Sequence, residues 1–336
     1  MSFDSIRLEK GLYTTGKSFT NALEAIDPSE NYKGTNLDGL DAYQRQLKRF
    51  DIKVNGPECS AVEKFFTNTD SAALFPEFVA RAVRQGMEEA DILSKIVAVT
   101  TVIDGLDYRS IESVPSDSDK ELAVVAEGAH IPETMIRTQE NLVKLYKRGR
   151  MLTASYEAIR FQKLDLFAIT LRQIGAYIAR SQFADAVKVL KYGDGNDNPA
   201  SSTSVKDSAN HTVTYADIID FWNSFSPYSL TTLIAGPDNT AKLLNLSEFK
   251  DAAAGFNFQS TGKMITPVGA ELIRSSAVDS SDIIGLDSSC ALEMIKSGEV
   301  LTEFDKLIDR QLERAAITST AGFSKIFKDA SKILTV

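Results

Sequence analysis

Histidine is the side chain best suited to acid–base chemistry near neutral pH, and the chain has two histidines, His130 and His211. Both lie in polar segments among turn residues, and no Gly-x-Ser-x-Gly nucleophile elbow accompanies either one. The patterns Gly-x-Gly-x-x-Gly, Cys-x-x-Cys and His-Glu-x-x-His are absent, and no carboxylate pair is marked by its spacing as an acid–base couple. We therefore expect two solvent-exposed loop histidines and no catalytic residue.

Two glycine-containing segments are similar to ligand-binding loops. The sequence Asp-Gly-Asn-Asp-Asn at 194–198 starts like a calcium loop, but Pro199 stands where that loop requires glycine and Val205 where it requires glutamate. The segment 255–263 ends in Gly-Lys, but its spacing is wrong for a phosphate loop, and Met264 replaces the Ser or Thr that would hold magnesium. We expect no metal and no cofactor, and a structural turn at 194–198.

The composition is that of a folded protein, because 43% of the 336 residues are hydrophobic and 25% are charged. A formal net charge of -9 argues against a sequence-reading nucleic-acid binder, although it allows loose contact through local basic patches. The first ten residues lack the pattern of a signal peptide, and no apolar run approaches the ~18 residues that span a bilayer. Cys59 and Cys290 lie far apart in sequence, which favours reduced thiols over a disulfide.

The first third of the chain consists of a weakly patterned leader followed by a helix and a strand. Residues 1–66 contain scattered Gly, Asn and Pro, and they indicate an extended arm with a short helix at 40–50 rather than an independent core. A helix begins at Leu74-Phe-Pro76, where proline is tolerated in the first turn, and runs to about Asp91. The β-branched residues of 92–103 predict a strand.

A long amphipathic helix at 164–191 is the main element of the second half. Tyr192-Gly193 ends this helix, because glycine is favoured just past a helix end. A helix at 215–225 follows, in which core packing explains Trp222 better than a stacking platform for bases. The remaining predicted elements are strands at 230–235, 263–266, 271–275, 282–287, 291–295 and 302–320, and a helix at 236–246.

Between Asp104 and Arg150 lies a long polar segment, the extended loop, which regains strand character at 141–152. Its outgoing part is acidic and its returning part is basic, so the two parts could attract each other across one hairpin or between neighbouring copies. The alternative is a solvated hairpin with weak cross-strand pairs. The candidate contact residues between subunits are Asp117, Asp119, Lys120, Lys144, Lys147 and Arg148.

A resemblance to a known family rests on the order of several short segments. They are Leu74-Phe-Pro-Glu-Phe-Val79, Glu127-Gly-Ala-His-Ile-Pro132, Leu142-Val-Lys-Leu145, Arg150-Met-Leu-Thr-Ala-Ser-Tyr-Glu157, the helix 164–191, Tyr192-Gly-Asp-Gly195, Leu233-Ile-Ala-Gly-Pro-Asp238 and the segment 303–334. In this order the chain resembles the major capsid protein of tailed bacteriophages over nearly its whole length. Each segment is weak alone, and their order and spacing carry the resemblance.

The resemblance implies an α+β fold, the tailed-phage capsid fold. The arm would reach over a neighbouring subunit, the extended loop would lie across the adjacent subunit, and axial-domain loops would meet at the centre of hexamers and pentamers. The implied parts are an N-terminal arm (1–66), the first helix and strand of a peripheral domain (67–103), an extended β-hairpin loop (104–150), a long spine helix with its following loop (151–214), an axial domain (215–300) and the C-terminal strands of the peripheral domain (301–336).

The implied function is self-assembly as hexamers and pentamers into an icosahedral head that encloses double-stranded DNA, in a virion assembled in the bacterial host cytoplasm. The implied partners are further copies of the chain, scaffolding, protease, portal and decoration proteins, and DNA in non-specific contact, with no membrane and no catalysis. The alternative is an encapsulin-type nanocompartment that encloses cargo proteins, but the long leader before Leu74 favours the phage. A soluble enzyme, the second alternative, has no positive feature in the sequence.

Shell size, host and N-terminal processing are left open by the sequence. Some members of the family form a lysine–asparagine crosslink between subunits. We find no lysine, asparagine and glutamate set in this chain that matches it, so the crosslink is not carried over and the sequence leaves open whether the subunits are crosslinked.

Overall fold

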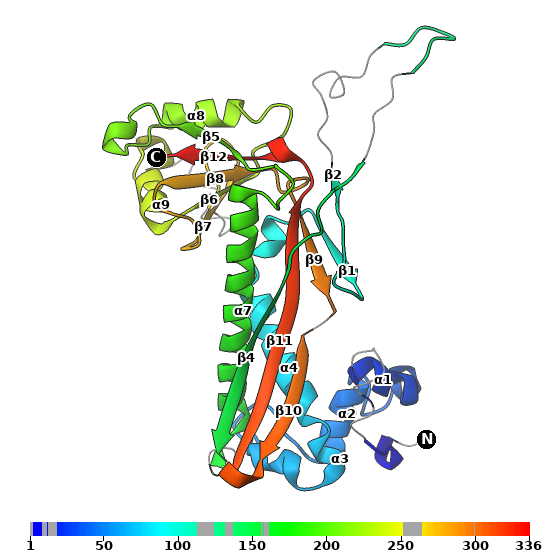
Figure 1. The fold of residues 1–336 in the computed structure, drawn as a ribbon. Coiled ribbons are helices and arrows are strands. Elements are labelled where there is room, and N and C mark those ends of the chain that lie inside the picture. The colour runs from blue at the N-terminus through cyan, green and yellow to red at the C-terminus, as the bar shows by residue number, and fades with distance from the viewer. Residues whose placement is uncertain are drawn as a thin grey trace. The chain divides into compact units, whose positions relative to one another are not determined.

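The computed structural model describes residues 3–8, 12, 19–112, 124–131, 137–155, 157, 161–250, 264–298 and 300–336 (Figure 1). The chain divides into two compact units, each made of three stretches of sequence. The helix α7 (Leu164–Tyr192) and the strand β11 (Leu312–Lys325) contribute residues to both units. Unit 1 comprises Met1–Asp91, Lys147–Arg180 and Glu299–Thr320, and unit 2 comprises Ile92–Tyr146, Ser181–Gly298 and Ala321–Val336.

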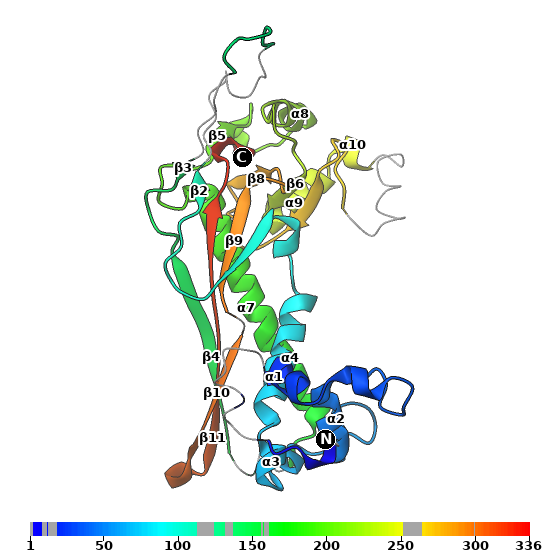
Figure 2. The ribbon, with the colours of Figure 1, turned by 90° about the vertical axis from the view of Figure 1, so that its right-hand side faces the viewer.

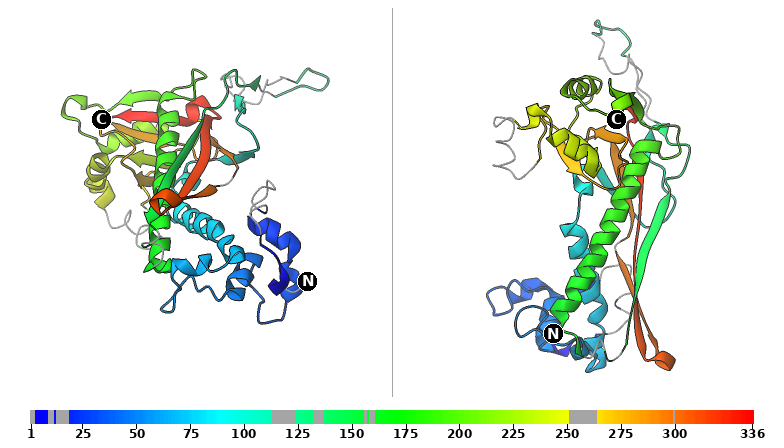
Figure 3. Two further views of the ribbon diagram at one scale, coloured as in Figure 1. Left: turned by 60° about the horizontal axis from the view of Figure 1, so that its bottom comes forward. Right: turned by 90° about the vertical axis from the view of Figure 1, so that its left-hand side faces the viewer.

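Two helices, α4 (Phe75–Glu89) and the first part of α7, form the centre of unit 1. Both predicted helices are confirmed, and α7 is one continuous helix (Figure 3). A Cβ on Gly86 would lie 2.0 Å from the Arg172 carbonyl oxygen, and a Cβ on Gly175 would lie 2.1 Å from that of Val83. The helices therefore touch backbone to backbone, an approach that only glycine permits at these positions.

The described part of residues 1–66 packs against α4. It contains α1 (Phe19–Ile26), α2 (Ala42–Arg49) and the 3-10 helices Phe3–Ser5, Ser29–Tyr32 and Val62–Phe66, and α3 (Thr69–Ala72) follows it. Leu23, Tyr43 and Val62 are buried in the same apolar cluster as Val79 of α4. The described part of this segment has no independent core, as expected, but it is folded onto its own subunit rather than extended. Its few apolar residues are buried only by packing against other parts of the chain, which the local sequence pattern does not show.

The strands of unit 1 form a hairpin that a third strand joins. The strand β10 (Leu301–Leu307) pairs antiparallel with the first part of β11, from Leu301↔Thr318 to Leu307↔Leu312 (Figure 2). The single strand expected at 302–320 is therefore two strands, joined by a turn at Ile308–Arg310. The strand β4 (Leu145–Ser155) also pairs with β11, and a Cβ on Gly149 would lie 2.5 Å from the Ile317 carbonyl oxygen.

In unit 2, the strand β9 (Leu292–Ser297) lies between β1 (Val99–Ile103) and the last part of β11. It pairs parallel with β1 and antiparallel with β11. The last part of α7 packs on one face of these strands, where Phe183 and Leu190 share an apolar cluster with Met294. The strand predicted at 92–103 is wrong in its first half, because Leu93–Lys95 form a 3-10 turn that buries Ile96.

A second sheet of unit 2 has the order β5-β12-β8-β6-β7. Its strands are β5 (Ser201–Ser204), β6 (Thr232–Ala235), β7 (Glu271–Arg274), β8 (Asp282–Leu286) and β12 (Ser331–Thr335), and its helices are α8 (Tyr215–Asn223), α9 (Pro237–Leu244) and α10 (Ser247–Lys250). The core position expected for Trp222 is wrong, because Ile218 and Phe221 face the core and Trp222, one position further round the helix, is 46% exposed.

Candidate assembly site at the root of the extended loop

The extended loop leaves unit 2 as a hairpin. The strands β2 (Ile111–Glu112) and β3 (Arg137–Thr138) pair antiparallel, and two backbone hydrogen bonds join the arms closer to the root (Figure 1). The Gln139 N–H donates to the Ser110 carbonyl at 2.9 Å, and the Val143 N–H donates to the Tyr108 carbonyl at 2.9 Å. The outgoing and returning arms are thereby held together where they leave unit 2.

The outgoing arm is tied to one buried carboxylate, that of Glu293 on β9, which is 5% exposed. Its Oε1 accepts hydrogen bonds from the Tyr108 hydroxyl at 2.8 Å and from Thr101 Oγ1 at 2.6 Å, and its Oε2 accepts one from Ser110 Oγ. Burial raises the pKa of Tyr108, and the hydrogen bond to Glu293 adds to that rise. Three hydroxyl donors thus satisfy a carboxylate that would otherwise be costly to bury.

The returning arm is tied to Asp194, in the turn that follows α7. Gly193 ends the helix with φ +81, and Asp194 Oδ2 then accepts hydrogen bonds from Gln139 Nε2 at 3.1 Å and from Ser324 Oγ at 3.0 Å. The backbone N–H of Lys325 is a third donor, at 2.9 Å. Burial alone would raise the pKa of Asp194, but the hydrogen bonds that it accepts together lower it.

The rest of the same turn also holds the returning arm. Asn141 Nδ2 donates to the Gly195 carbonyl at 2.9 Å, and the Asn141 N–H donates to Asn196 Oδ1 at 3.0 Å. The segment 194–198 is a turn, as predicted. Sequence analysis missed that oxygen atoms of this turn accept hydrogen bonds from the extended loop. The only sequence signal for these bonds was the polar composition of the turn.

Lys325 brings a buried cation next to this network. Its residue is 1% exposed, it pairs with Leu292 of β9, and its Nζ has no hydrogen-bond partner among the described residues. Burial lowers the pKa of Lys325 from its ordinary 10.5 to about 8, although the negative charge of Asp194 opposes that shift. Nothing in the sequence distinguished this lysine from the exposed ones.

The hydrogen bonds described above for these two carboxylates involve none of the predicted contact residues. Asp117, Asp119 and Lys120 fall outside the described residues. Lys144 and Lys147 are exposed and Arg148 is half-buried, so they stay candidates for contact with another copy. The two histidines lie in loops as expected: His130 is exposed, and His211 Nδ1 lies 2.9 Å from the Val336 carbonyl oxygen.

Sequence analysis also missed how apolar the surface of the extended loop is. Of the twenty-one exposed large hydrophobic residues in the described part of the chain, seven lie in the extended loop. Val124, near the hairpin tip, is 102% exposed and Ile131 is 71% exposed. The segment was interpreted as polar because its apolar residues are scattered among charged ones. The seven residues are Leu106, Ile111, Val124, Val125, Ile131, Leu142 and Tyr146.

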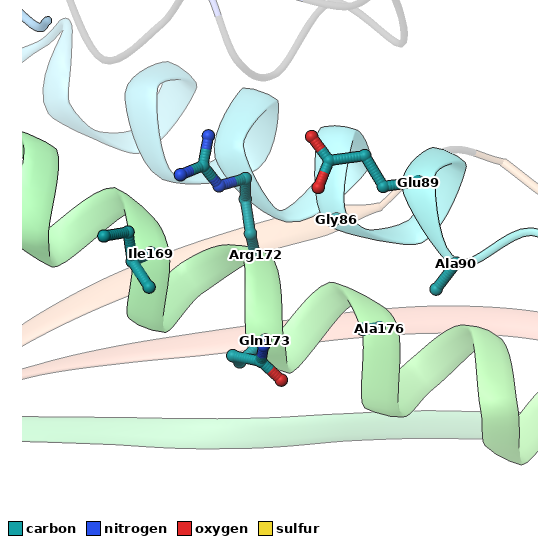
Figure 4. Close-up of a pocket in the computed structure, with 7 residues that line it drawn as sticks. All are labelled: Gly86, Glu89, Ala90, Ile169, Arg172, Gln173 and Ala176. Atoms are coloured by element: carbon teal, nitrogen blue, oxygen red, sulfur yellow. The ribbon is translucent and has the colours of Figure 1, made fainter.

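Unit 1 has a groove of about 420 Å³ beside the contact between α4 and α7 (Figure 4). It is lined by Gly86, Glu89 and Ala90 from α4 and by Ile169, Arg172, Gln173 and Ala176 from α7. Within the described ranges, no group of three or more His, Cys, Asp or Glu residues could hold a metal ion. Nor does any helix in those ranges have the length and hydropathy to cross a membrane.

Comparison with known proteins gives one family match and several structural matches. The family described as phage capsid protein matches residues 138–305, which is half of the chain. No curated protein has a matching sequence.

The structural matches share little sequence. The capsid of an empty GTA particle has a TM-score of 0.54 at 12% identity, covering 73% of this chain and 89% of that one. The native GTA capsid has a TM-score of 0.52 at 12% identity, covering 72% and 89%. The SrpI encapsulin from Synechococcus elongatus PCC 7942 has a TM-score of 0.49 at 12% identity, covering 72% and 86%. The two GTA capsids show that the fold is that of a capsid protein.

Proposed function

This chain belongs to the phage capsid protein family, and from that premise we propose that its copies assemble as hexamers and pentamers into an icosahedral head around double-stranded DNA. It is a structural protein, a major capsid shell protein and a component of the virion. The family match carries this conclusion, because it covers half of the chain and includes α7, the end of the extended loop and most of the second sheet of unit 2.

The extended loop is proposed to lie across an adjacent copy, and the axial domain at 215–300 to meet its counterparts at the centre of each hexamer or pentamer. The loop's exposed apolar residues support the first part, since burying exposed apolar side chains against another surface is favourable. Closed symmetry reuses one such surface in every copy, which is how many identical subunits form a shell.

Assembly in the host cytoplasm, with scaffolding, protease, portal and decoration proteins, is proposed from the family alone. Contact with DNA is proposed to be non-specific, because a net charge of -9 opposes tight binding to phosphates. The encapsulin alternative predicts a small shell filled with cargo protein. Negative-stain microscopy of the expressed protein, alone and with the products of its neighbouring genes, separates the two: a large DNA-filled head supports the phage proposal, and a small cargo-filled shell contradicts it.

A charge reversal tests the contact made by the returning arm. The triple variant Lys144→Glu, Lys147→Glu and Arg148→Glu should leave the subunit folded by circular dichroism but reduce the yield of particles at least tenfold. A control variant makes the same net charge change at exposed basic residues outside the loop, Lys33, Lys188 and Arg274. Normal particles from the loop variant would show that its charges are merely solvated.

A further inference from the structure

Two carboxylates under the loop, the buried Glu293 and the half-buried Asp194, lie next to each other through Ser324. Ser324 is the cross-strand partner of Glu293 in the pairing of β9 with β11, so the two side chains share one face of the strands. The Ser324 hydroxyl lies 3.0 Å from Asp194 Oδ2 and 3.1 Å from Gln139 Oε1. The carboxylate that holds the outgoing arm therefore stands beside the residue through which the returning arm is held.

This network accounts for the attachment of the hairpin root. The described residues between 104 and 143 make side-chain hydrogen bonds to three other parts of unit 2. The first is Glu293, the second is Asp194 together with Ser324 and Lys325 of β11, and the third is the turn at 195–196. The bonds of Arg109 stay within the loop, on the Gln139 and Glu140 carbonyls. The outgoing arm is thus joined to the rest of unit 2 by side-chain bonds to Glu293, and the returning arm by bonds to Asp194, Ser324, Lys325 and the turn at 195–196.

We propose that Glu293 and Asp194 are positioning residues that fix the direction in which the extended loop leaves its subunit, and so aim its apolar tip at the neighbouring copy. This rests on the proposed function, because aiming matters only if the loop makes that contact. Two attachment points, one for each arm, resist tilt as well as translation, whereas one point would leave the hairpin free to swing. A small tilt at the root moves residues further along the hairpin by a larger distance.

The chemistry of the two sites suits this purpose better than apolar packing would. Hydrogen bonds to a carboxylate are short and directional, and in a buried site they are stronger than in water. The outgoing arm presents two donors to Glu293, the Tyr108 hydroxyl and Ser110 Oγ, which fixes its rotation as well as its distance. The returning arm presents Gln139, whose amide both donates to Asp194 and accepts from Ser324.

The test uses variants that remove donors and keep shape. The double variant Tyr108→Phe with Ser110→Ala detaches the outgoing arm from Glu293, and Gln139→Met separately detaches the returning arm from Asp194. The matched control is Thr231→Val, which removes partly buried hydrogen bonds to Leu286 and Ser288 in the same unit, away from the loop.

Hydrogen–deuterium exchange of the unassembled subunit and electron microscopy of assembled particles are the two measurements. Each loop variant should raise amide exchange at the root, residues 108–112 and 138–143, at least tenfold, and lower the yield of regular particles at least tenfold. Thr231→Val should assemble normally although it loses similar stability, so a general loss of stability does not explain the result. If one loop variant fails to fold, the other variant still tests whether its arm's attachment positions the loop.

The outcomes separate this inference from the proposed function. Loop variants that exchange faster at the root yet form normal particles would overturn the positioning role and leave the capsid function intact. Unchanged exchange at the root would overturn it as well. A wild-type protein that forms no shell under any condition would instead refute the proposed function.

Discussion

The buried ammonium of Lys325 gives the sharpest quantitative prediction, namely that replacing it with methionine stabilises the protein. Lys325 has a pKa of about 8 in the fold against 10.5 ordinarily, so the fold disfavours its protonated form. The difference of 2.5 units, at 1.36 kcal/mol each, amounts to about 3 kcal/mol. Because the residue is 1% exposed, solvent screening does not reduce that figure much.

The pH dependence follows from the sign of the shift. Between pH 8 and 10.5 the unfolded chain holds the proton and the folded chain has released it, so the stability of the wild type rises with pH across this window. The penalty is complete below pH 8 and absent above pH 10.5. Lys325→Met, which keeps the unbranched stem, should therefore be more stable than wild type by about 3 kcal/mol at pH 7, and this advantage should shrink by about 2 kcal/mol at pH 9.5.

Guanidinium unfolding followed by tryptophan fluorescence is the assay. Trp222 is the only tryptophan in the chain, and it lies in unit 2 with Lys325, so its signal reports the unit in question. Lys188→Met, at an exposed position of α7 in the same unit, is the control and should change stability by less than about 0.5 kcal/mol. A Lys325→Met protein that is less stable than wild type at pH 7, or whose advantage is the same at both pH values, would refute the reasoning.

Three further perturbations should have distinct effects. Gly86→Ala should destabilise unit 1 by about 3 kcal/mol or more in urea unfolding, because its Cβ would lie 2.0 Å from the Arg172 carbonyl oxygen. Asp27→Ala should cost about 3 kcal/mol in the same assay, because it removes the carboxylate 2.8 Å from the Nε of Arg45, whose side chain is fully buried. The pKa of Asp194 is lowered in the fold, so its ionised carboxylate stabilises the fold above pH 3.8, and this contribution is lost as the pH falls below that value. In the wild type, protection of the amides at 138–143 from hydrogen exchange should therefore fall in acid. In Asp194→Asn this loss of protection should be absent.

Elements with a strong local pattern were predictable from sequence. The helices α4 and α7 followed from apolar periodicity and from Pro76 and Gly193 at their ends, and the short strands β6 to β9 followed from short apolar runs that alternate with turn residues. Errors arose where the tertiary fold overrides the local pattern. Ile96 belongs to a β-branched run but is buried beside a 3-10 turn, and Trp222 is apolar but lies one position away from the buried face of its helix.

The candidate site was hidden for a different reason. Tyr108 and Ser110 are 185 and 183 residues away from Glu293 in sequence, and Gln139 is 55 residues away from Asp194. No local spacing marks a carboxylate whose donors come from so far along the chain. Sequence analysis considered Asp194 only as a calcium ligand. It did not single out Glu293, which lies in a predicted strand and is one of many acidic residues in the chain.

The structure bears on whether the extended loop is a solvated hairpin or a contact between copies. A hairpin that serves only as a solvated excursion has no need of exposed valine and isoleucine at its tip, which add apolar surface that favours association. Nor has it a need for the buried Glu293 and the half-buried Asp194 at its root, since each costs desolvation that its hydrogen bonds must offset. An apolar tip and a fixed root belong together only if the tip must reach one particular surface. That combination favours contact between copies, with apolar burial at the tip supplying most of the affinity and the basic residues of the returning arm contributing mainly to specificity.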